Sequence, residues 1–469
     1  MTEVKQYIQD LLAQQQILIT DNKIKLFEEF VKDETNCNAV QQILHHQKML
    51  MSNWEIKNRV VDIQQQHVSI PNGTVGKAYE ASLNFITLGW DDIVDYKLEG
   101  LTELGLIYNV ASEIIKGLPA HSGDIKLILK FRIRQEPEDA EMHERTIALI
   151  INPDPKSLWK NIDSDATDPN WKEDTVSVFS KIGDKHIVVA SSRGRSHANA
   201  GSFREDDFAF KYFEDTGWGI VAVSDGAGSA KLSRQGSKIA CDAVITYFEE
   251  NLTPALSSEF DSMLLSYKVD ATEAAQKMVS HFTYNNLSKA AYAAYQKLVA
   301  KATEKETLLK DFHSTLIFTL FKKYDFGYAI LSFGVGDCPI AVLNKNLTEV
   351  TLMNGLDVGE FGGGTRFITM PEIFKDDKFS ARFKFKLIED FSYLIMMTDG
   401  IYDPKFVVEA NLEKIEKWQE FLQDMEGKNE DNAQVIFDAT NKLIAQQLSA
   451  WMNFWSAGNH DDRTLAIVF

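Results

Sequence analysis

Four short turns that carry aspartate adjoin strongly apolar, strand-like runs in the second half of this 469-residue chain. Their sequences are VAVSDGAG, LSFGVGD, LIMMTDG and GNHDDRT, which end at Gly228, Asp337, Gly400 and Thr464. An aspartate at the end of a buried strand costs free energy unless a cation or hydrogen-bond donors compensate it. The four turns therefore predict a fold that gathers them around metal ions. Mg²⁺ and Mn²⁺ prefer oxygen ligands, and no Cys/His cluster in the sequence competes for this role.

Composition limits the class of protein. A hydrophobic fraction of 44% supports packed cores, and a net charge of −19 argues against nucleic acid or an anionic membrane as the main partner. The three cysteines, Cys37, Cys241 and Cys338, lie far apart, which predicts free thiols in a reducing compartment. The N-terminal residues lack the pattern of a signal peptide, and no apolar run is long enough to span a bilayer. These features predict a cytoplasmic protein.

The hydrophobic pattern divides the chain into regions. Residues 1–66 repeat apolar side chains at helical spacing, and residues 67–153 alternate apolar and polar side chains, as a small β-sandwich does. Residues 154–175 are polar and predict a linker. Residues 176–469 predict one further domain.

The last region combines strands and helices. Six strand-like runs enclose helical stretches at about 233–250 and 271–301, and a third helical stretch is predicted at about 411–456. This pattern favours an α+β layered fold over a Rossmann unit. No phosphate-binding or dinucleotide-binding glycine motif opens a helix after a strand, which argues against a P-loop or dinucleotide enzyme.

The predicted β-sandwich has a sequence resemblance of its own. IPNGTVGKAYEASLNF (70–85) and IIKGLPAHSGDIKLILKFRI (114–133) match the opening strand and the closing hairpin of a bacterial domain family. With these stretches, residues 67–153 resemble the immunoglobulin-like, cadherin-like modules of bacteria. The resemblance implies a binding or spacing role, without chemistry of its own.

The aspartate turns share their order and context with a known enzyme family. Ser196-His197, Gly201 and Glu205-Asp206 match the first motif of its bacterial branch, S-H-x-x-x-G-x-x-x-[QE]-D. The later motifs D-G, S/T-T, G-D, D-G and D-[DN]-x-T match, in order, Asp225-Gly226, Ser314-Thr315, Gly336-Asp337, Asp399-Gly400 and Asp461-Asp462-Arg463-Thr464. Residues 154–469 thus resemble the type 2C metal-dependent serine/threonine protein phosphatases.

That resemblance implies a four-layer α-β-β-α sandwich that hydrolyses phosphoserine or phosphothreonine in proteins. Asp225 would bridge two Mg²⁺ or Mn²⁺ ions, and the carbonyl of Gly226 would join the first ion. Asp399 and Asp461 would hold the second ion. The metals would lower the pKa of a water molecule, which attacks phosphorus without a covalent enzyme intermediate. The candidate catalytic residues are therefore Asp225, Asp399 and Asp461.

Three further acidic residues complete the implied metal ligands. Asp206 or Glu205 would act at the second ion, directly or through water. Asp337 would make a weaker third site together with Asp399. Gly362-Gly363-Gly364-Thr365 falls where the family carries a mobile flap, although a plain flexible loop explains this run equally well.

The chain departs from the family pattern at two positions. Many eukaryotic members carry a histidine after the first D-G as a proposed general acid, and this chain has Ala227 there. The phosphate-binding arginine of the family lies five residues before the first-motif aspartate, where this chain has Gly201. Nearby candidates to replace that arginine are Arg193, Arg195, His197 and Arg204.

The sequence is compatible with three functions. The first is a Mn²⁺- or Mg²⁺-dependent phosphoprotein phosphatase, and the second is a catalytically silent phosphatase fold that binds phosphoproteins as a scaffold. The third is a metallohydrolase of small phosphate esters. Relatives of this bacterial branch imply a partner serine/threonine kinase and a von Willebrand A-type protein, and the regions before residue 154 would recruit a partner or the substrate.

Overall fold

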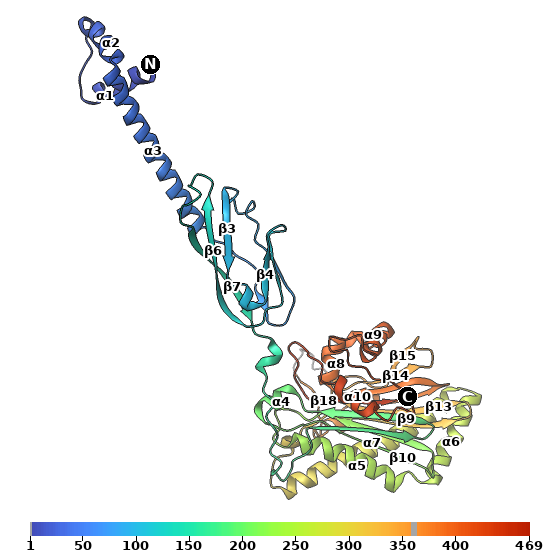
Figure 1. Cartoon of the computed structure of the whole chain (residues 1–469). Helices are drawn as coiled ribbons and strands as arrows, with labels where there is room; N and C mark the ends of the chain where they lie inside the picture. The colour runs from blue at the N-terminus through green and yellow to red at the C-terminus, as the bar shows by residue number, and fades with distance from the viewer. Residues whose placement is uncertain (1, 358–363) are drawn as a thin grey trace. The chain divides into compact units, whose positions relative to one another are not determined.

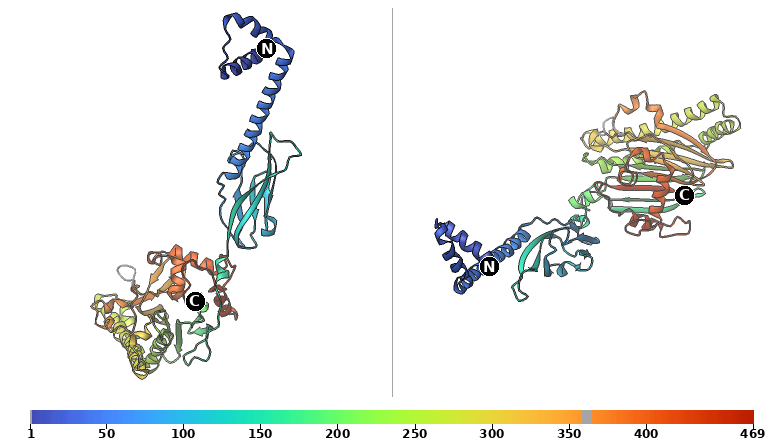
Figure 2. Two further views of the ribbon diagram at one scale, coloured as in Figure 1. Left: turned by 90° about the vertical axis from the view of Figure 1, so that its left-hand side faces the viewer. Right: turned by 90° about the horizontal axis from the view of Figure 1, so that it is seen from above.

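The computed structural model describes residues 2–357 and 364–469, so Gly362 and Gly363 of the predicted flap lie outside the described residues. The chain forms two compact units, one ending at Leu158 and one starting at Trp159 (Figure 1, Figure 2). This boundary falls inside the segment 154–175 that the sequence predicts as a linker. Within the described ranges, no helix combines the length and apolarity that a membrane span requires.

The first unit begins with three helices. Val4 and Ile8 of the first helix pack against Val31 of the second and Val40 of the third. Asp33 caps the third helix by accepting a hydrogen bond from the backbone N–H of Asn36 at 3.1 Å. The helices are α1 (Thr2–Gln14), α2 (Ile24–Lys32) and α3 (Glu34–Gln65).

The β-rich part of the first unit consists of two sheets. One sheet has the strand order β1-β7-β6-β3 and the other has the order β2-β5-β4. Their inward side chains form one core, which Val60 and Ile63 of α3 join. The buried Arg145 of β7 donates hydrogen bonds to the carbonyls of Ile63 and Gln66, and so fixes the end of α3 to the sheet. The strands are β1 (Gly73–Thr74), β2 (Tyr79–Ser82), β3 (Ile93–Glu99), β4 (Leu106–Asn109), β5 (Ile114–Gly117), β6 (Gly123–Ile133) and β7 (His143–Asn152).

The second unit contains two larger sheets that face each other. Nearly continuous apolar runs such as β13 and β18 are buried along their whole length, as strands inside a layered fold must be. The five-stranded sheet has the order β10-β11-β12-β13-β16, and the six-stranded sheet has the order β15-β14-β17-β18-β9-β8. The strands are β8 (Thr175–Ile182), β9 (Lys185–Ser192), β10 (Asp207–Phe213), β11 (Trp218–Ser224), β12 (Leu316–Tyr324), β13 (Gly327–Val335), β14 (Ile340–Asn344), β15 (Val350–Leu352), β16 (Phe383–Ile388), β17 (Phe391–Met397) and β18 (Arg463–Val468).

Helices cover both outer faces of this sandwich (Figure 1). One core joins the five-stranded sheet to α5–α7, a second joins the six-stranded sheet to α8–α10, and a third lies between the sheets. The second unit is therefore a four-layer α-β-β-α arrangement. Its helices are α4 (Arg195–Ala200), α5 (Ser233–Asn251), α6 (Pro254–Val269), α7 (Glu273–Glu304), α8 (Asp399–Phe406), α9 (Ile415–Met425) and α10 (Ile444–Trp451).

The prediction of a helical stretch at about 411–456 is wrong for residues 426–443. Two separate helices, α9 and α10, occupy part of it. Between them the side chain of Asn429 bonds the backbone of Asp424, Asp431 and Ala433, so local side-chain bonds replace helical ones. Helix α6, which starts at Pro254 after the capping residue Thr253, was not predicted from the sequence.

Candidate metal centre

The strand register brings the aspartate turns to one end of the sandwich. In the five-stranded sheet Asp207 lies opposite Ser224, and Val223 lies opposite Ile317, so β10 starts where β11 ends. In the six-stranded sheet Arg463 pairs with Ser192, so β18 starts where β9 ends. The aspartates next to these strand ends are Asp206, Asp225, Asp337, Asp399, Asp461 and Asp462.

Hydrogen bonds fix the backbone of Asp225, and acidic residues surround its carboxylate. Its N–H donates to Thr315 Oγ1 at 2.9 Å, and its carbonyl accepts from the N–H of Thr315 at 2.8 Å. Burial raises its pKa well above the ordinary value, and the charges of Asp399, Asp206, Asp461 and Asp337 raise the pKa further. A carboxylate with this many acidic neighbours needs a proton or a cation to stay in place.

Gly226 lets two chain segments approach each other closely. A Cβ atom at this position would lie 2.6 Å from the carbonyl oxygen of Glu205, which is too close for any side chain. Gly400 is equally constrained, since a Cβ atom would lie 1.8 Å from the carbonyl oxygen of Asp462. The glycines of both D-G motifs are therefore required by packing around the acidic residues.

Asp206 is a buried carboxylate with two hydroxyl donors. Thr398 Oγ1 and Thr464 Oγ1 donate to its Oδ2 at 2.8 and 2.9 Å. Burial and the charge of Asp462 raise the pKa of Asp206 to about 7, although both threonines favour the ionised form. The two hydroxyls fix one oxygen of Asp206 and leave the other available to a ligand.

Asp337 and Asp399 each keep a buried oxygen without a donor. Within the described residues neither Asp337 Oδ1 nor Asp399 Oδ1 has a hydrogen-bond partner, although Thr365 Oγ1 donates to Asp337 Oδ2 at 2.7 Å. Burial and the charges of Asp461, Asp337 and Asp206 raise the pKa of Asp399 well above its ordinary value. Ligand atoms of Asp225, Asp337 and Cys338 lie within 4.8 Å of one another, and a hard cation would use the two carboxylates rather than the thiol.

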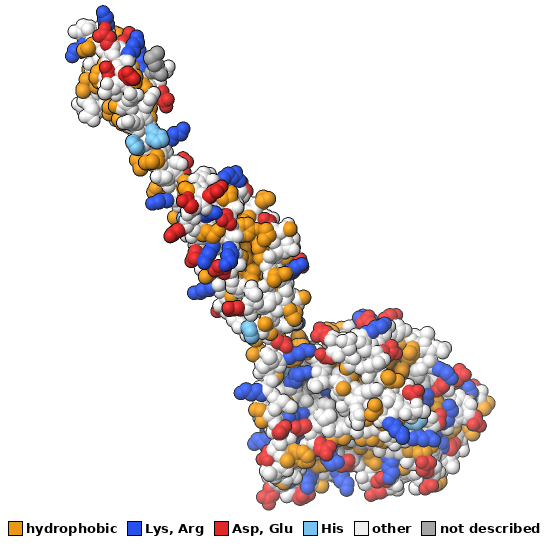
Figure 3. Space-filling view, in the orientation of Figure 1, with side chains coloured by type: hydrophobic (Ala, Val, Ile, Leu, Met, Phe, Trp, Pro, Cys, Tyr) orange, Lys and Arg blue, Asp and Glu red, His pale blue; other side chains and the backbone are white. Residues whose placement is uncertain are grey.

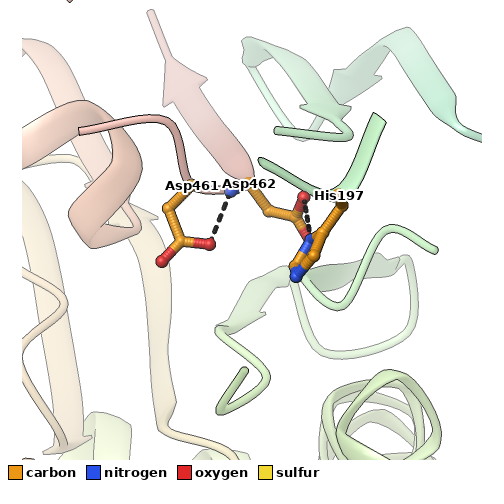
Figure 4. Close-up of side chains that lie close together, drawn as sticks. All are labelled: His197, Asp461 and Asp462. Atoms are coloured by element: carbon orange, nitrogen blue, oxygen red, sulfur yellow. Dashed lines mark hydrogen bonds and ion pairs between the residues drawn. The ribbon is translucent and has the colours of Figure 1, made fainter. Parts of the chain in front are cut away.

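The adjacent residues Asp461 and Asp462 have different contacts. Asp462 accepts hydrogen bonds from the N–H of Gly194 at 2.5 Å, from the N–H of Glu205 and from His197 Nδ1 at 2.9 Å. Figure 4 shows the carboxylate of Asp462 directed to His197, and the carboxylate of Asp461 directed away from it. Asp462 therefore organises the protein around the site. Asp461 accepts the N–H of Asp462 at 2.8 Å, its one side-chain hydrogen bond with a described residue, and keeps lone pairs for a ligand.

The residues present fit one or more divalent cations. The site offers buried carboxylate oxygens without donors, clustered negative charge and glycines that admit close backbone approach. Oxygen-only ligands with this charge suit Mg²⁺ or Mn²⁺. The geometry brings together the ligands that the sequence predicts, which are Glu205, Asp206, Asp225, Gly226, Asp337, Asp399 and Asp461.

The arginines suggested for phosphate have protein partners instead. Arg193 bonds the carbonyls of Ser202 and Ile162 and pairs with Asp174. Arg204 is buried and donates to Ser191 Oγ, to the carbonyl of Asp206 and to the carbonyl of Glu173. Arg195 bonds the carbonyl of Asn453 and lies over the ring of Trp455. Gly201 ends α4 at φ 66°, a left-handed conformation that disfavours the arginine found there in the family.

Lys172, in the predicted linker, is a site residue that the sequence pattern did not predict. Its ammonium group bonds the carbonyl of Asp206 at 2.7 Å and the carboxylate of Asp207 at 3.0 Å. It also bonds the carbonyl of Arg234, at the start of α5, at 3.2 Å. Burial lowers the pKa of Lys172, and the charge of Asp207 opposes this shift. A lysine in a polar stretch gives no sequence signal for such a role.

Replacing Lys172 tests its structural role. In Lys172→Met the carboxylate of Asp207, whose side chain is 13% exposed, loses its ammonium partner, which we expect to cost up to about 3–5 kcal/mol of unfolding free energy. Mn²⁺ should also bind more weakly, because the backbone of Asp206 is released. Urea unfolding and Mn²⁺ titration measure the two effects. Lys181→Met changes an exposed lysine and is the control, and equal stability of both variants would contradict the role.

The raised pKa of Asp206 predicts how pH affects the metal-free protein. The folded state keeps a proton on Asp206 up to about pH 7, whereas the unfolded chain releases it near pH 4. The raised pKa of Asp206 therefore stabilises the folded state fully below about pH 4, and this stabilisation is lost as pH rises through about 7. In EDTA we expect Tm to fall between pH 5 and 8, less steeply in Asp206→Asn. Mn²⁺ should raise Tm at pH 8, and no effect of Mn²⁺ would contradict a metal site.

Comparisons with known proteins identify the family. Residues 193–453 match the family described as "Protein phosphatase 2C", and no curated protein matches. Similar solved structures include the serine/threonine phosphatase Stp1 from Staphylococcus aureus, at 15% identity and TM-score 0.35, covering 62% of this chain and 96% of that one. The catalytic domain of the phosphatase PstP with 2 manganese ions has 13% identity and TM-score 0.35, covering 63% and 98%. The family match extends over more than half of the sequence, and the chain therefore belongs to the protein phosphatase 2C family.

Proposed function

We propose that this chain is a metal-dependent phosphatase that hydrolyses phosphoserine and phosphothreonine in proteins. The observation that carries this proposal is the convergence of carboxylates from both sheets at one end of the sandwich. Two of these carboxylates, Asp337 and Asp399, have buried oxygens without donors in the described structure. Family membership supports the same reaction class.

The proposed metal ligands have distinct roles. Asp225 would bridge two ions, the carbonyl of Gly226 would complete the first site, and Asp399 with Asp461 would form the second. When bound, such ions activate water and neutralise charge on the phosphoryl oxygens. Thr398 and Thr464 hold Asp206 by its Oδ2. Asp337 with Asp399 would form a weaker third site.

The remaining residues restrict how the leaving group is protonated. Ala227 has no titratable side chain, and its N–H donates to the carbonyl of His313 at 3.0 Å. The departing serine or threonine alkoxide would therefore take its proton from water or from another donor. Among the phosphate-binding candidates, Arg193 and Arg204 would have to leave their protein partners to reach a substrate.

A second candidate is a silent phosphatase fold that binds phosphoproteins. The observations that favour it are Ala227 in place of the histidine of many eukaryotic members and Gly201 in place of the family arginine. The complete set of carboxylates favours catalysis, because a binding module has no need to bury so many like charges. A measurement of turnover separates the two candidates.

Hydrolysis of p-nitrophenyl phosphate is the first test. We expect turnover with Mn²⁺ or Mg²⁺, none in EDTA, and a loss of more than about a hundredfold in Asp225→Asn and Asp399→Asn, because each removes charge from the proposed metal site. Asp242→Asn is the matched control, since this exposed aspartate of α5 pairs with Lys238 and is not one of the proposed metal ligands. If Mn²⁺ binds by calorimetry and no metal supports turnover, the binding-module function replaces the phosphatase.

For the first unit we propose a role in recruitment. Its two-sheet sandwich is consistent with an immunoglobulin-like module, and it contributes none of the proposed metal ligands. The proposed partners are a phosphoprotein substrate, a serine/threonine kinase and a von Willebrand A-type protein, all in the cytoplasm. These partners follow from the resemblance to the bacterial branch.

Removing the first unit tests recruitment. A protein of residues 159–469 keeps the whole second unit and should hydrolyse p-nitrophenyl phosphate like the full chain. Its kcat/KM on a phosphoprotein substrate should fall by about tenfold or more, because binding outside the catalytic unit is lost. Equal loss on both substrates would contradict a separate recruiting role.

A further inference from the structure

Among the described residues of the first unit, none packs against the middle of α3. The start of α3 contributes Val40 to the core with α1 and α2, and its end contributes Val60 and Ile63 to the sandwich core. Every residue from 45 to 55 is exposed. Figure 3 shows hydrophobic side chains along this helical stretch. Helices in water gain most of their stability from packing an apolar face, so this stretch lacks its usual support.

The exposed apolar residues follow a coiled-coil spacing. Ile43, Leu50, Trp54 and Val61 are separated by seven, four and seven residues, and Leu50 and Trp54 are 64% and 65% exposed. Met51 flanks this stripe and is 59% exposed. With Gln47 and Lys57 at the intervening positions, the stripe alternates steps of four and three residues, which is the spacing of a helix that packs along another helix.

We propose that α3 pairs with the α3 of a second copy of this chain, in antiparallel orientation. The spacing seven, four, seven is the same in both directions. A two-fold axis near residue 52 would therefore place Leu50 against the Trp54 of the other copy, and Ile43 against its Val61. Each of these contacts occurs twice, once for each copy.

Charge supports the antiparallel orientation. Lys57 lies on the same stripe as Leu50, and a parallel pair in register would place the two copies of Lys57 against each other. In the antiparallel pair Lys57 faces Gln47, whose amide oxygen accepts a hydrogen bond. Residues 1–66 hold nine acidic and seven basic residues, so the surface around the stripe is nearly neutral in a chain of net charge −19.

The apolar area is sufficient for a dimer. Ile43, Leu50, Met51, Trp54 and Val61 are all exposed. At roughly 100 Å² of exposed surface for each side chain, two copies would bury about 1,000 Å² of mainly apolar area, which is about the minimum for a biological interface.

Sedimentation equilibrium of the full chain at micromolar concentration tests the dimer. We expect the wild type to be dimeric, and dimerisation to weaken more than about a hundredfold in the double variant Leu50→Glu, Trp54→Glu. Met49→Glu places one such charge away from the stripe and should remain dimeric; Met49 is 45% exposed. A monomeric wild type, or a double variant that dimerises as well as Met49→Glu, would overturn the proposal. Circular dichroism confirms that each variant is folded.

Spin-label distances test the orientation without changing the stripe. A nitroxide at Gln42, attached through cysteine in a Cys37→Ser background, leaves Cys241 and Cys338 buried and unlabelled. The antiparallel pair displaces the two labels by 20 residues, or roughly 30 Å along the axis. A parallel pair would leave them roughly one helix spacing apart, about 10 Å. A single distance near the shorter value would overturn the antiparallel arrangement.

Discussion

Mutual repulsion among buried carboxylates is the constraint on which the second unit depends. Asp206 is buried, Asp225 and Asp399 are partly buried near it, and their neighbours' charges raise the pKa of each. Without a cation or a proton, this arrangement opposes folding. A protein keeps such a cost only where the charge has a use, and a divalent cation that bridges the carboxylates converts the repulsion into attraction.

The protein around the carboxylates is built to hold them in place. Lys172 and Arg204 both bond the carbonyl of Asp206, one from the segment before β8 and the other from the turn before β10. Asp462 bonds the backbone of Gly194 and Glu205 and the ring of His197, which ties the start of β18 to the first motif. Through these contacts Lys172, Arg204 and His197 support the backbone and side chains of the site. Their residue types alone do not distinguish this role from phosphate binding.

The first unit combines a packed core with an exposed apolar stretch of helix. Its sandwich has a complete apolar core, and Arg145 fastens the end of α3 to it. The middle of α3 leaves Leu50, Met51 and Trp54 in water. Burying these side chains away from water is favourable, so their exposure in the monomer favours association through this surface.

The sequence by itself determined the apolar strands that adjoin the aspartate turns, the helices α5 and α7, and the identities of the carboxylates. Apolar runs ending in aspartate, such as LIMMTDG, carry both signals in a few neighbouring residues. The break between α9 and α10 was not predictable from apolar periodicity, because Asn429 forms it through local side-chain bonds. Only the tertiary structure decided which charged residues face the site. Asp461 and Asp462 are chemically identical neighbours, and the function of Lys172 depends on atoms that lie 34 and 62 residues away in sequence. Long-range packing sets those contacts, and no local pattern encodes them.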